Sequence, residues 1–520
     1  MSESSVTMTG AATPLVLALD MGTSSCRALL YDRQARPVAG SEVQIPYSLR
    51  TTADGGAESD PRALLDLVTK CVDGVLGRAQ PPVGAIGAVG MSCFWHSLLG
   101  LDQAGQPLTP VYYWADRRSG RQVTELRNRL DERAIHQRTG CVIHSSYWPA
   151  KLCWVRETQP DLFGRVARWC SFADYATRTL FGDDLTSVPM ASGTGMLDFH
   201  RVVWDEELIA ATEVAPETLP PLVGRSHASS DLRSSYSERW PALANVPWYP
   251  GIGDGACANV GCGAVGPERI ALTVGTSAAV RIIVTNPVDA PLTVPSDLWA
   301  YRLDDERVVL GAALSNGGNV IDWLRHLTGI APDGQAMAAA AALPPDQHGL
   351  TILPFLSGER SPLWSDQATG VIAGLTLHTS LDDLLRAGME AIAYRLAMLY
   401  QSLDELANAD HQIVANGGAI LGSPGWMQII TDNLGHPLVP LPAAAEASAR
   451  GAAVLALDSC SLIDGLSAAP DPAEDARPVL PNPDAADAYQ AGRARQALLQ
   501  SLLLPDRSVW SDAVMTQPRD

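Results

Sequence analysis

The sequence is poor in lysine: its 520 residues contain only Lys70 and Lys151. It has no GxxxxGK[ST] motif, in which a lysine reaches the phosphates of a bound nucleotide, so a P-loop ATPase is excluded. The nine cysteines are scattered singly, without the CxxC spacing of a zinc or redox site, and we expect reduced, mostly buried thiols. No apolar run approaches the roughly 18 residues that span a bilayer.

Basic residues are also scarce relative to acidic ones, 37 against 57, which gives a formal net charge of −20. That charge repels nucleic acid and anionic lipid, so polynucleotide and membrane partners are set aside. The segment before Leu15 has no basic residue and does not resemble a signal peptide. We therefore expect a cytoplasmic protein with a small-molecule ligand; a homodimer stays open.

A repeated pattern organises the chain. The apolar run 15–19 stops at Asp20-Met21-Gly22-Thr23-Ser24-Ser25 and resumes at 27–31, which predicts a hairpin. The run 270–274 likewise enters Gly275-Thr276-Ser277 and resumes at 280–283. The spacing far exceeds the period of about 20 to 50 residues of solenoid repeats, so it indicates a domain-scale duplication.

Length and element order support two α/β domains facing a cleft. A 520-residue chain with 46% hydrophobic residues is too long for one core, and apolar runs alternate with helical stretches. We predict an N-terminal domain over 15–263, a C-terminal domain over 264–466, and a linker with a C-terminal helix over 467–520.

Gly-Thr-Ser turns suit phosphate, because glycine lets the backbone approach closely while its neighbours offer N–H and hydroxyl donors. One such turn favours a plain hairpin, whereas two in corresponding places favour a nucleotide cleft. Asp20 precedes the first turn by two residues, where the second copy has Thr273. Only Asp20 can direct a carboxylate towards magnesium, although closing the turn is an alternative role for it.

Gly253-Asp254-Gly255 looks like the end of a strand leading into a helix. Asp254 could cap that helix. Alternatively it could act as a general base, since flanking glycines leave room for a substrate and a helix N-terminus keeps a carboxylate ionised. The residues alone leave these two interpretations about equal.

Five motifs follow one another along the chain: Leu19-Asp20-Met21-Gly22-Thr23-Ser24-Ser25, Gly253-Asp254-Gly255, Thr273-Val274-Gly275-Thr276-Ser277, Leu356-Ser357-Gly358-Glu359-Arg360-Ser361-Pro362-Leu363-Trp364 and Asn416-Gly417-Gly418-Ala419. In kind and order they resemble the motifs of the FGGY carbohydrate kinases. The resemblance covers roughly 15–457. It implies the actin-like ATPase fold, with two ribonuclease-H-like domains around a cleft, and it favours the general-base interpretation of Asp254.

The same resemblance implies binding residues. ATP and its phosphates are expected at Gly22, Thr23, Ser24, Ser25, Arg27, Gly275, Thr276, Gly318, Asp322, Gly418 and Gly422, and Mg²⁺ at Asp20. Gly422 and Asp322 replace side-chain amides of glycerol kinases.

For the sugar, Trp95, His96, Asp116 and Arg118 fall where these kinases bind polyols. Without the resemblance we would read His96 as a core histidine and Asp116 with Arg118 as an ion pair. The pair His96-Ser97 and the motif Trp-Ala-Asp-Arg-Arg-Ser look most like gluconate kinases, with xylulose kinases next, and Trp95 replaces the methionine that is common before this histidine.

The expected reaction is transfer of the γ-phosphate of ATP to a primary hydroxyl of a sugar acid, D-gluconate giving 6-phosphogluconate. A xylulose, ketose or polyol kinase is the alternative within the family. An actin-like nucleotide switch that binds a protein partner is the alternative outside enzymes.

Overall fold

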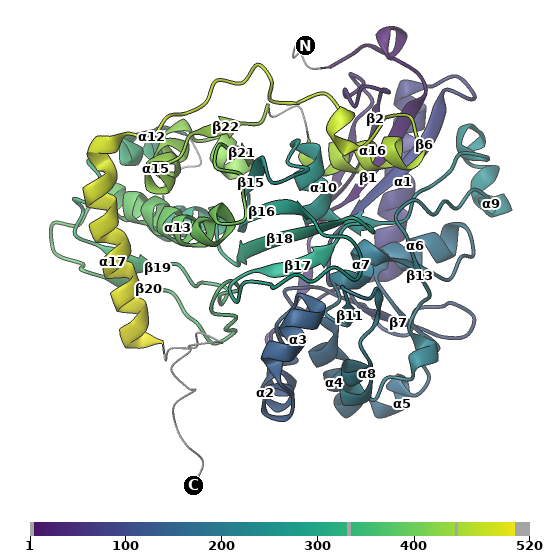
Figure 1. Ribbon diagram of the computed structural model, residues 1–520, viewed down its shortest axis with the longest axis horizontal. Helices are drawn as coiled ribbons and strands as arrows, with labels where there is room; N and C mark the ends of the chain where they lie inside the picture. Colours follow the sequence, from purple (N-terminus) through teal and green to yellow (C-terminus); the bar gives the residue numbers. More distant parts are fainter. Residues whose placement is uncertain (1–4, 330–333, 443–445, 505–520) are drawn as a thin grey trace.

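The computed structural model describes residues 5–329, 334–442 and 446–504, and two mixed β-sheets dominate it (Figure 1). The first sheet has the order β14-β6-β1-β2-β3, with β1 (Leu15–Met21), β2 (Ser25–Tyr31), β3 (Val43–Pro46), β6 (Ile86–Cys93) and β14 (Ile252–Gly253). The second has the order β17-β18-β16-β15-β21-β22, with β15 (Arg269–Val274), β16 (Ala278–Thr285), β17 (Trp299–Arg302), β18 (Arg307–Leu314), β21 (Gln412–Asn416) and β22 (Leu438–Pro440).

The two sheets share one topology. In each, an antiparallel hairpin (β1-β2 or β15-β16) is extended on one side by a third antiparallel strand (β3 or β18). On the other side two parallel strands follow, β6 and β14 in one sheet and β21 and β22 in the other. This is the ribonuclease-H-like arrangement, repeated as in actin-like ATPases, and it confirms the predicted fold class. Strand β17 is an additional edge of the second sheet.

Helices cover both sheets. The principal ones are α1 (Pro61–Ala79), α2 (Gly120–Arg129), α3 (Glu132–Thr139), α4 (Trp148–Thr158), α6 (Phe172–Leu180), α10 (Asp254–Gly261), α11 (Gly318–Thr328), α13 (Leu381–Asp404), α15 (Pro424–Leu434), α16 (Ala447–Ser459) and α17 (Ala486–Leu503). Helix α13 starts with a capping box between Ser380 and Asp383 and packs against β16 and β18. Helix α1 starts with Asp60 accepting hydrogen bonds from the first-turn N–H groups, and it packs against β2 and β3.

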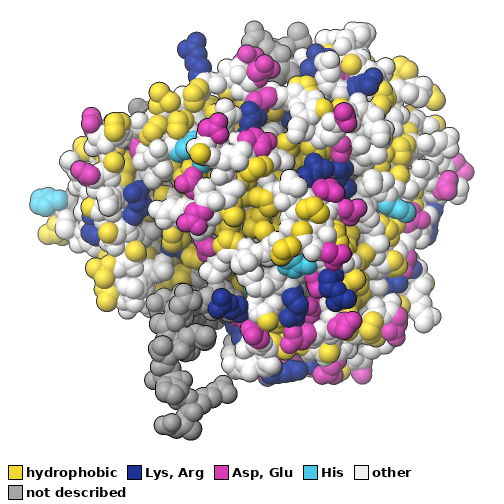
Figure 2. All heavy atoms as spheres, viewed as in Figure 1, with side chains coloured by type: hydrophobic (Ala, Val, Ile, Leu, Met, Phe, Trp, Pro, Cys, Tyr) yellow, Lys and Arg dark blue, Asp and Glu magenta, His cyan; other side chains and the backbone are white. Residues whose placement is uncertain are grey.

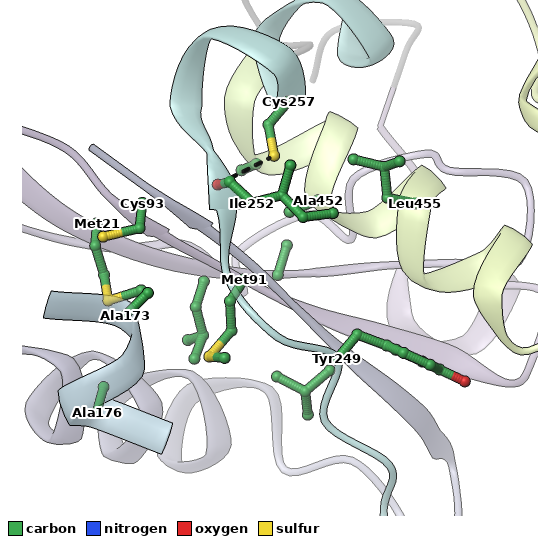
Figure 3. Packing of buried hydrophobic residues seen from close by; sticks show 14 of the residues in the cluster. Met21, Met91, Cys93, Ala173, Ala176, Tyr249, Ile252, Cys257, Ala452 and Leu455 are labelled. Carbon is green, nitrogen blue, oxygen red and sulfur yellow. Dashed lines mark hydrogen bonds between the residues drawn. The ribbon is translucent and has the colours of Figure 1, made fainter. Parts of the chain in front are cut away.

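Helix α16 belongs to the first sheet, although it lies late in the sequence. It packs against β1, β6 and α10, and its apolar residues, Ala449 and 452–457, are part of the same buried apolar cluster as β1 (Figure 3). The predicted second domain, 264–466, includes α16 in its range, yet the apolar face of this helix completes the core around the first sheet.

Glycines allow α10 and α16 to meet backbone to backbone. A Cβ atom added at Gly451 would lie 1.8 Å from the carbonyl oxygen of Cys257, and one at Gly261 would lie 1.7 Å from that of Ala447. On the other side of α16, a Cβ at Gly90 would lie 2.2 Å from the carbonyl oxygen of Ala452. The two helices thus form a tightly packed joint between the two sheets.

After α16 the chain returns to the second domain. It passes Arg269, which is ion-paired with Asp471, and ends in α17, which packs against α13 at the far edge of the molecule (Figure 1). Helix α17 lies where the sequence predicts a terminal helix. Residues 505–520 of the predicted terminal segment lie outside the described residues.

Acidic and basic side chains are interspersed on the face seen in Figure 2. All nine cysteines are free thiols, and eight of them are buried. Within the described ranges, no helix has the length and apolarity needed to cross a bilayer.

Candidate active site

Two carboxylates meet at the carboxyl edge of the first sheet. In the parallel register, Asp20 on β1 lies beside Ser92 on β6, and Ser92 lies beside Ile252 on β14, two residues before Asp254. Ser92 Oγ donates a 2.7 Å hydrogen bond to Asp20 Oδ1. Burial raises the pKa of Asp20, although Ser92 and the nearby guanidinium of Arg27 act in the opposite direction.

Asp254 occupies the first position of α10, after Gly253 at the N-cap. The Gly255 N–H donates a 2.8 Å hydrogen bond to Asp254 Oδ1. Burial, and then the charge of Asp20, raise the pKa of Asp254 to about 6, while Arg281 opposes the shift. A carboxylate with its pKa near working pH suits a general base, since it is ionised yet can hold a proton.

Asp254 lines a pocket of about 240 Å³ between the two domains. Four residues predicted from the sequence line it together: Thr23, Trp95, His96 and Asp254. Ser277 and Ser448 lie in the same lining. Five aromatic residues from both domains also line it: Trp114, Tyr147, Trp299, Tyr301 and Trp364.

Trp95 packs on the glycines that flank Asp254. A Cβ at Gly253 would lie 1.8 Å from the indole ring, and one at Gly255 would lie 2.7 Å from it. The indole Nε1 donates a 3.0 Å hydrogen bond to the carbonyl of Pro189, which fixes the ring. The space expected here for a substrate is therefore filled by Trp95, which forms a rigid wall beside Asp254.

His96 is held in a defined tautomer. Its backbone is left-handed, with φ of 67°, and Nδ1 is hydrogen-bonded to the carbonyl oxygen of Gly193. A carbonyl only accepts, so Nδ1 carries the hydrogen and Nε2 is an acceptor. Burial lowers the pKa of His96 to about 3, so the ring stays neutral at working pH. Lys151 Nζ donates to the His96 carbonyl at 3.1 Å and helps to hold this loop.

Two arginines that the sequence analysis did not assign to the site line the pocket, Arg281 on β16 and Arg360 in the loop after β19 (Thr351–Leu353). Among the described residues, no carboxylate lies within 4.0 Å of either guanidinium, whereas Arg118, Arg138 and Arg225 each have such a partner. Arg360 stands in a motif already noted, Gly358-Glu359-Arg360, but nothing in the local sequence places its side chain in the pocket.

Asp116 and Arg118 are not brought to this pocket. Arg118 Nη2 forms ion pairs with Asp116 at 2.5 Å and with Glu58 at 2.8 Å, and its guanidinium stacks over the ring of Trp154. Asp116 also accepts a hydrogen bond from the backbone of Ala57. These contacts are those of an ion pair, the alternative interpretation of Asp116 and Arg118 given above.

Arg27 is likewise occupied. Its side chain forms ion pairs with Glu42, at 3.1 Å, and with Glu446, just before α16. The first turn itself is closed by a 3.0 Å hydrogen bond from the Gly22 N–H to the carbonyl of Ser25, and Tyr47 N–H donates to the carbonyl of Ser24.

The second turn packs against the start of α11. The Gly318 N–H donates a 2.8 Å hydrogen bond to the carbonyl of Gly275, and Asn319 N–H donates to that of Thr276 at 3.2 Å. A Cβ at Gly318 would lie 2.7 Å from the Gly275 carbonyl oxygen, so only glycine fits there. These residues form a compact, backbone-rich surface.

The other predicted nucleotide residues lie nearby or on the surface. Gly418 begins α14 (Gly418–Leu421), which contacts β15, and has open space beside its Cα, while Gly422 ends that helix. Asp322 lies on the exposed side of α11, 3.7 Å from Arg325 Nη1.

The two halves also repeat a hydrogen-bonded pair. Thr273 Oγ1 donates to Asn416 Oδ1 at 2.8 Å, in the register position that Ser92 and Asp20 occupy in the first sheet. The first pair carries a negative charge and the second pair is neutral. The asymmetry predicted between Asp20 and Thr273 therefore has a structural basis in two corresponding side-chain pairs.

A second acidic cluster lies outside the pocket, where Asp346, His348 and Glu390 bring ligand atoms within 4.8 Å of one another. Arg386 Nε donates to Glu390 at 2.5 Å and Arg495 Nη1 donates to Asp346 at 2.8 Å. These arginines already balance the carboxylates, so the cluster has the character of a structural ion network.

Two ribonuclease-H-like domains, two Gly-Thr-Ser turns and an ionisable carboxylate in the pocket between them define a nucleotide-dependent enzyme of the actin-like ATPase class. Residues 15–261 match the N-terminal domain, and residues 270–459 the C-terminal domain, of the FGGY family of carbohydrate kinases. The chain belongs to this family. It is a phosphotransferase with an alcohol group as acceptor, and ATP is the phosphoryl donor.

Proteins similar to this chain are named for different substrates. A gluconokinase of Bacillus subtilis (strain 168) is 27% identical over 470 residues, covering 88% of this chain and 90% of the relative. A xylulose kinase of Streptomyces rubiginosus is 31% identical over 477 residues, covering 90% and 92%. The crystal structure of gluconate kinase from Lactobacillus acidophilus has a TM-score of 0.85 and 27% identity, covering 96% of this chain and all of that one.

Proposed function

We propose that this kinase phosphorylates a sugar acid, D-gluconate, at its terminal primary hydroxyl, giving 6-phosphogluconate. The observation that carries the proposal is Arg360, a cation in the pocket wall whose Nε is buried and has no hydrogen-bond partner. An unpaired buried donor on a charged group is costly, and the carboxylate of an aldonate would satisfy it with a charge-assisted hydrogen bond.

Arg360 is fixed for that task. Its Nη2 donates a 2.8 Å hydrogen bond to the carbonyl of Leu314, and its guanidinium carbon lies 4.7 Å from the ring centroid of Trp114. Burial lowers the pKa of Arg360, which means that the buried guanidinium pays for its charge and would gain from an anionic partner.

In the proposed mechanism the primary hydroxyl of the sugar lies against Asp254, which accepts its proton as the oxygen attacks the γ-phosphorus of ATP. The neutral His96 offers Nε2 as an acceptor for another sugar hydroxyl. The Gly-Thr-Ser turns bind the phosphates, and closure of the domains aligns the reactants and excludes water.

Asp20 fits a magnesium site. It is a carboxylate at the cleft edge of β1, and Ser92 donates to only one of its oxygens. When bound, magnesium would neutralise phosphate oxygens as charge develops on them.

The experiment is a comparison of kcat/KM for D-gluconate, D-xylulose and glycerol. In the Arg360→Met variant we expect kcat/KM for gluconate to fall roughly 10-fold to 100-fold, the scale of a hydrogen bond to a charged group, with little change for xylulose. Arg118→Gln is the matched control, because its ion pairs lie outside the pocket.

The results separate the sugar-acid proposal from the kinase assignment and identify the arginine that binds the acid. If xylulose is the best substrate of the wild type, the sugar-acid proposal fails while the kinase assignment stands. If Arg118→Gln loses gluconate selectively and Arg360→Met does not, the acid binds where the sequence first suggested.

A further inference from the structure

The second pocket arginine, Arg281, is held from two sides across the domain boundary. Its Nε donates a 3.0 Å hydrogen bond to Asn259 Oδ1 on α10, the helix that begins with Asp254. Its Nη2 donates a 2.7 Å hydrogen bond to Thr273 Oγ1 on β15. Asn259 Nδ2 in turn donates to the Arg281 carbonyl at 3.3 Å. The guanidinium is therefore fixed, and Nη1 is not used by these bonds.

Arg281 is only 7% exposed and has no carboxylate within 4.0 Å among the described residues. A buried cation without a counter-ion is costly, and burial lowers its pKa. Asp254 is the charge that most favours its protonated form. An anion that binds beside Arg281 in the pocket would supply the counter-ion that this guanidinium lacks.

The position of Arg281 identifies that anion. Thr273, its partner, stands in the second half where Asp20 stands in the first, two residues before the phosphate turn. Ser277 of that turn lines the same pocket. Arg360 lies over Trp114 and donates to the Leu314 carbonyl. Of the two pocket guanidiniums, Arg281 is the one whose hydrogen bonds join the strand entering this turn to the helix that begins with Asp254, so its position favours a phosphate as the anion.

Arg27, which the sequence predicts at the phosphates, does not reach the pocket in the structure, because its side chain is held by ion pairs with Glu42 and Glu446. It is also absent from the pocket lining, whereas Arg281 is part of it.

We propose that Arg281 is a catalytic residue for phosphoryl transfer, with Nη1 donating to an oxygen of the phosphoryl group while it moves. In that step the sugar hydroxyl oxygen forms a bond to the γ-phosphorus, and its proton goes to Asp254. The bond from the γ-phosphorus to the bridging oxygen breaks, and its electron pair leaves with ADP. A fixed guanidinium stabilises the charge on the three equatorial oxygens.

The proposal rests on the kinase activity and not on the identity of the sugar, so it fails separately from the gluconate assignment. The test uses the full-length enzyme with Arg281→Met and Arg281→Lys, and it measures kcat and KM for gluconate and for xylulose. We expect Arg281→Met to lower kcat by about 100-fold to 1,000-fold with either sugar, with less than about a threefold change in the KM for the sugar. Arg281→Lys should recover part of kcat, because it restores the charge without the fork of donors.

Arg360→Met is the matched comparison, since it removes the other pocket guanidinium and should act on the KM of gluconate alone. A rise in the KM of gluconate with intact kcat in Arg281→Met would overturn the proposal and make Arg281 the acid-binding residue. Unchanged kcat and KM would reduce Arg281 to a structural contact between α10 and β15. If Arg281→Met does not fold, the Lys variant decides: wild-type kcat overturns the proposal, and a reduced kcat with unchanged KM supports it.

Discussion

The ionisation of Asp254 gives the sharpest prediction. Its pKa is raised to about 6, mainly by burial, so at pH 7 about nine tenths of the molecules carry the ionised base and at pH 5 about one tenth do. The ionised form is the active one, so kcat/KM should be near its plateau at pH 7. It should fall as the pH drops through 6, approaching a tenfold loss for each further unit.

The assay is ADP release under saturating ATP, measured between pH 4.5 and 8. Asp254→Asn should lose roughly 10²-fold to 10⁴-fold in kcat and should show no inflection near pH 6. Its Tm at pH 7 should be no lower than that of the wild type, because a carboxyl with a raised pKa opposes folding when it is ionised. Arg281→Met should move the inflection to higher pH, since Arg281 is a charge that lowers the pKa of Asp254.

Two results would refute this reasoning. One is an acid limb near pH 4 in the wild type, which would mean that burial does not act on the base as the structure indicates. The other is an Asp254→Asn enzyme with near-normal turnover and an intact fold, which would return Asp254 to the role of a helix-capping residue.

Two further changes test the asymmetry of the halves and the packing of the joint. Asp20→Ala should raise the magnesium concentration needed for half-maximal rate, whereas Thr273→Ala should have a mild effect, because only Asp20 offers a carboxylate to the metal; equal magnesium titrations in both variants would contradict the assignment. Gly451→Ala should lower the free energy of unfolding by about 1 to 3 kcal/mol in denaturant titrations, because its Cβ would lie 1.8 Å from the carbonyl oxygen of Cys257. An unchanged denaturation midpoint would mean that α10 and α16 can separate at no cost.

The duplicated hairpins and the carboxylates at the sheet edge are predictable from sequence because their signals are local. An apolar run that ends at a Gly-Thr-Ser turn specifies a strand and its turn without reference to distant residues. Asp20 follows the run 15–19 directly, and Asp254 follows a short strand end between glycines, so their place at the carboxyl ends of parallel strands follows from the element order.

Other features depend on contacts between distant segments. The ion pair between Arg118 and Glu58 forms because β5 (Ala57–Ser59) lies beside the loop that contains Asp116. No pattern in the sequence predicts that these two segments are neighbours. Arg281 lies on a predicted strand, where alternation gives its face but not its partner Asn259. The sequence also does not predict that α16 packs in the first core, because the apolar pattern of a helix does not indicate which sheet the helix covers.

The late position of α16 has a consequence for the way this protein is made. The first domain begins at Leu15, but its core cannot close until Ser459 has emerged from the ribosome. Throughout synthesis of the intervening second domain, the apolar surface of β1 and β6 that α16 covers remains open to water. We therefore expect the nascent chain to depend on protection from aggregation until translation is nearly complete. A fragment ending at Gly263 should be insoluble by itself and should dissolve when a segment containing 447–459 is supplied in trans.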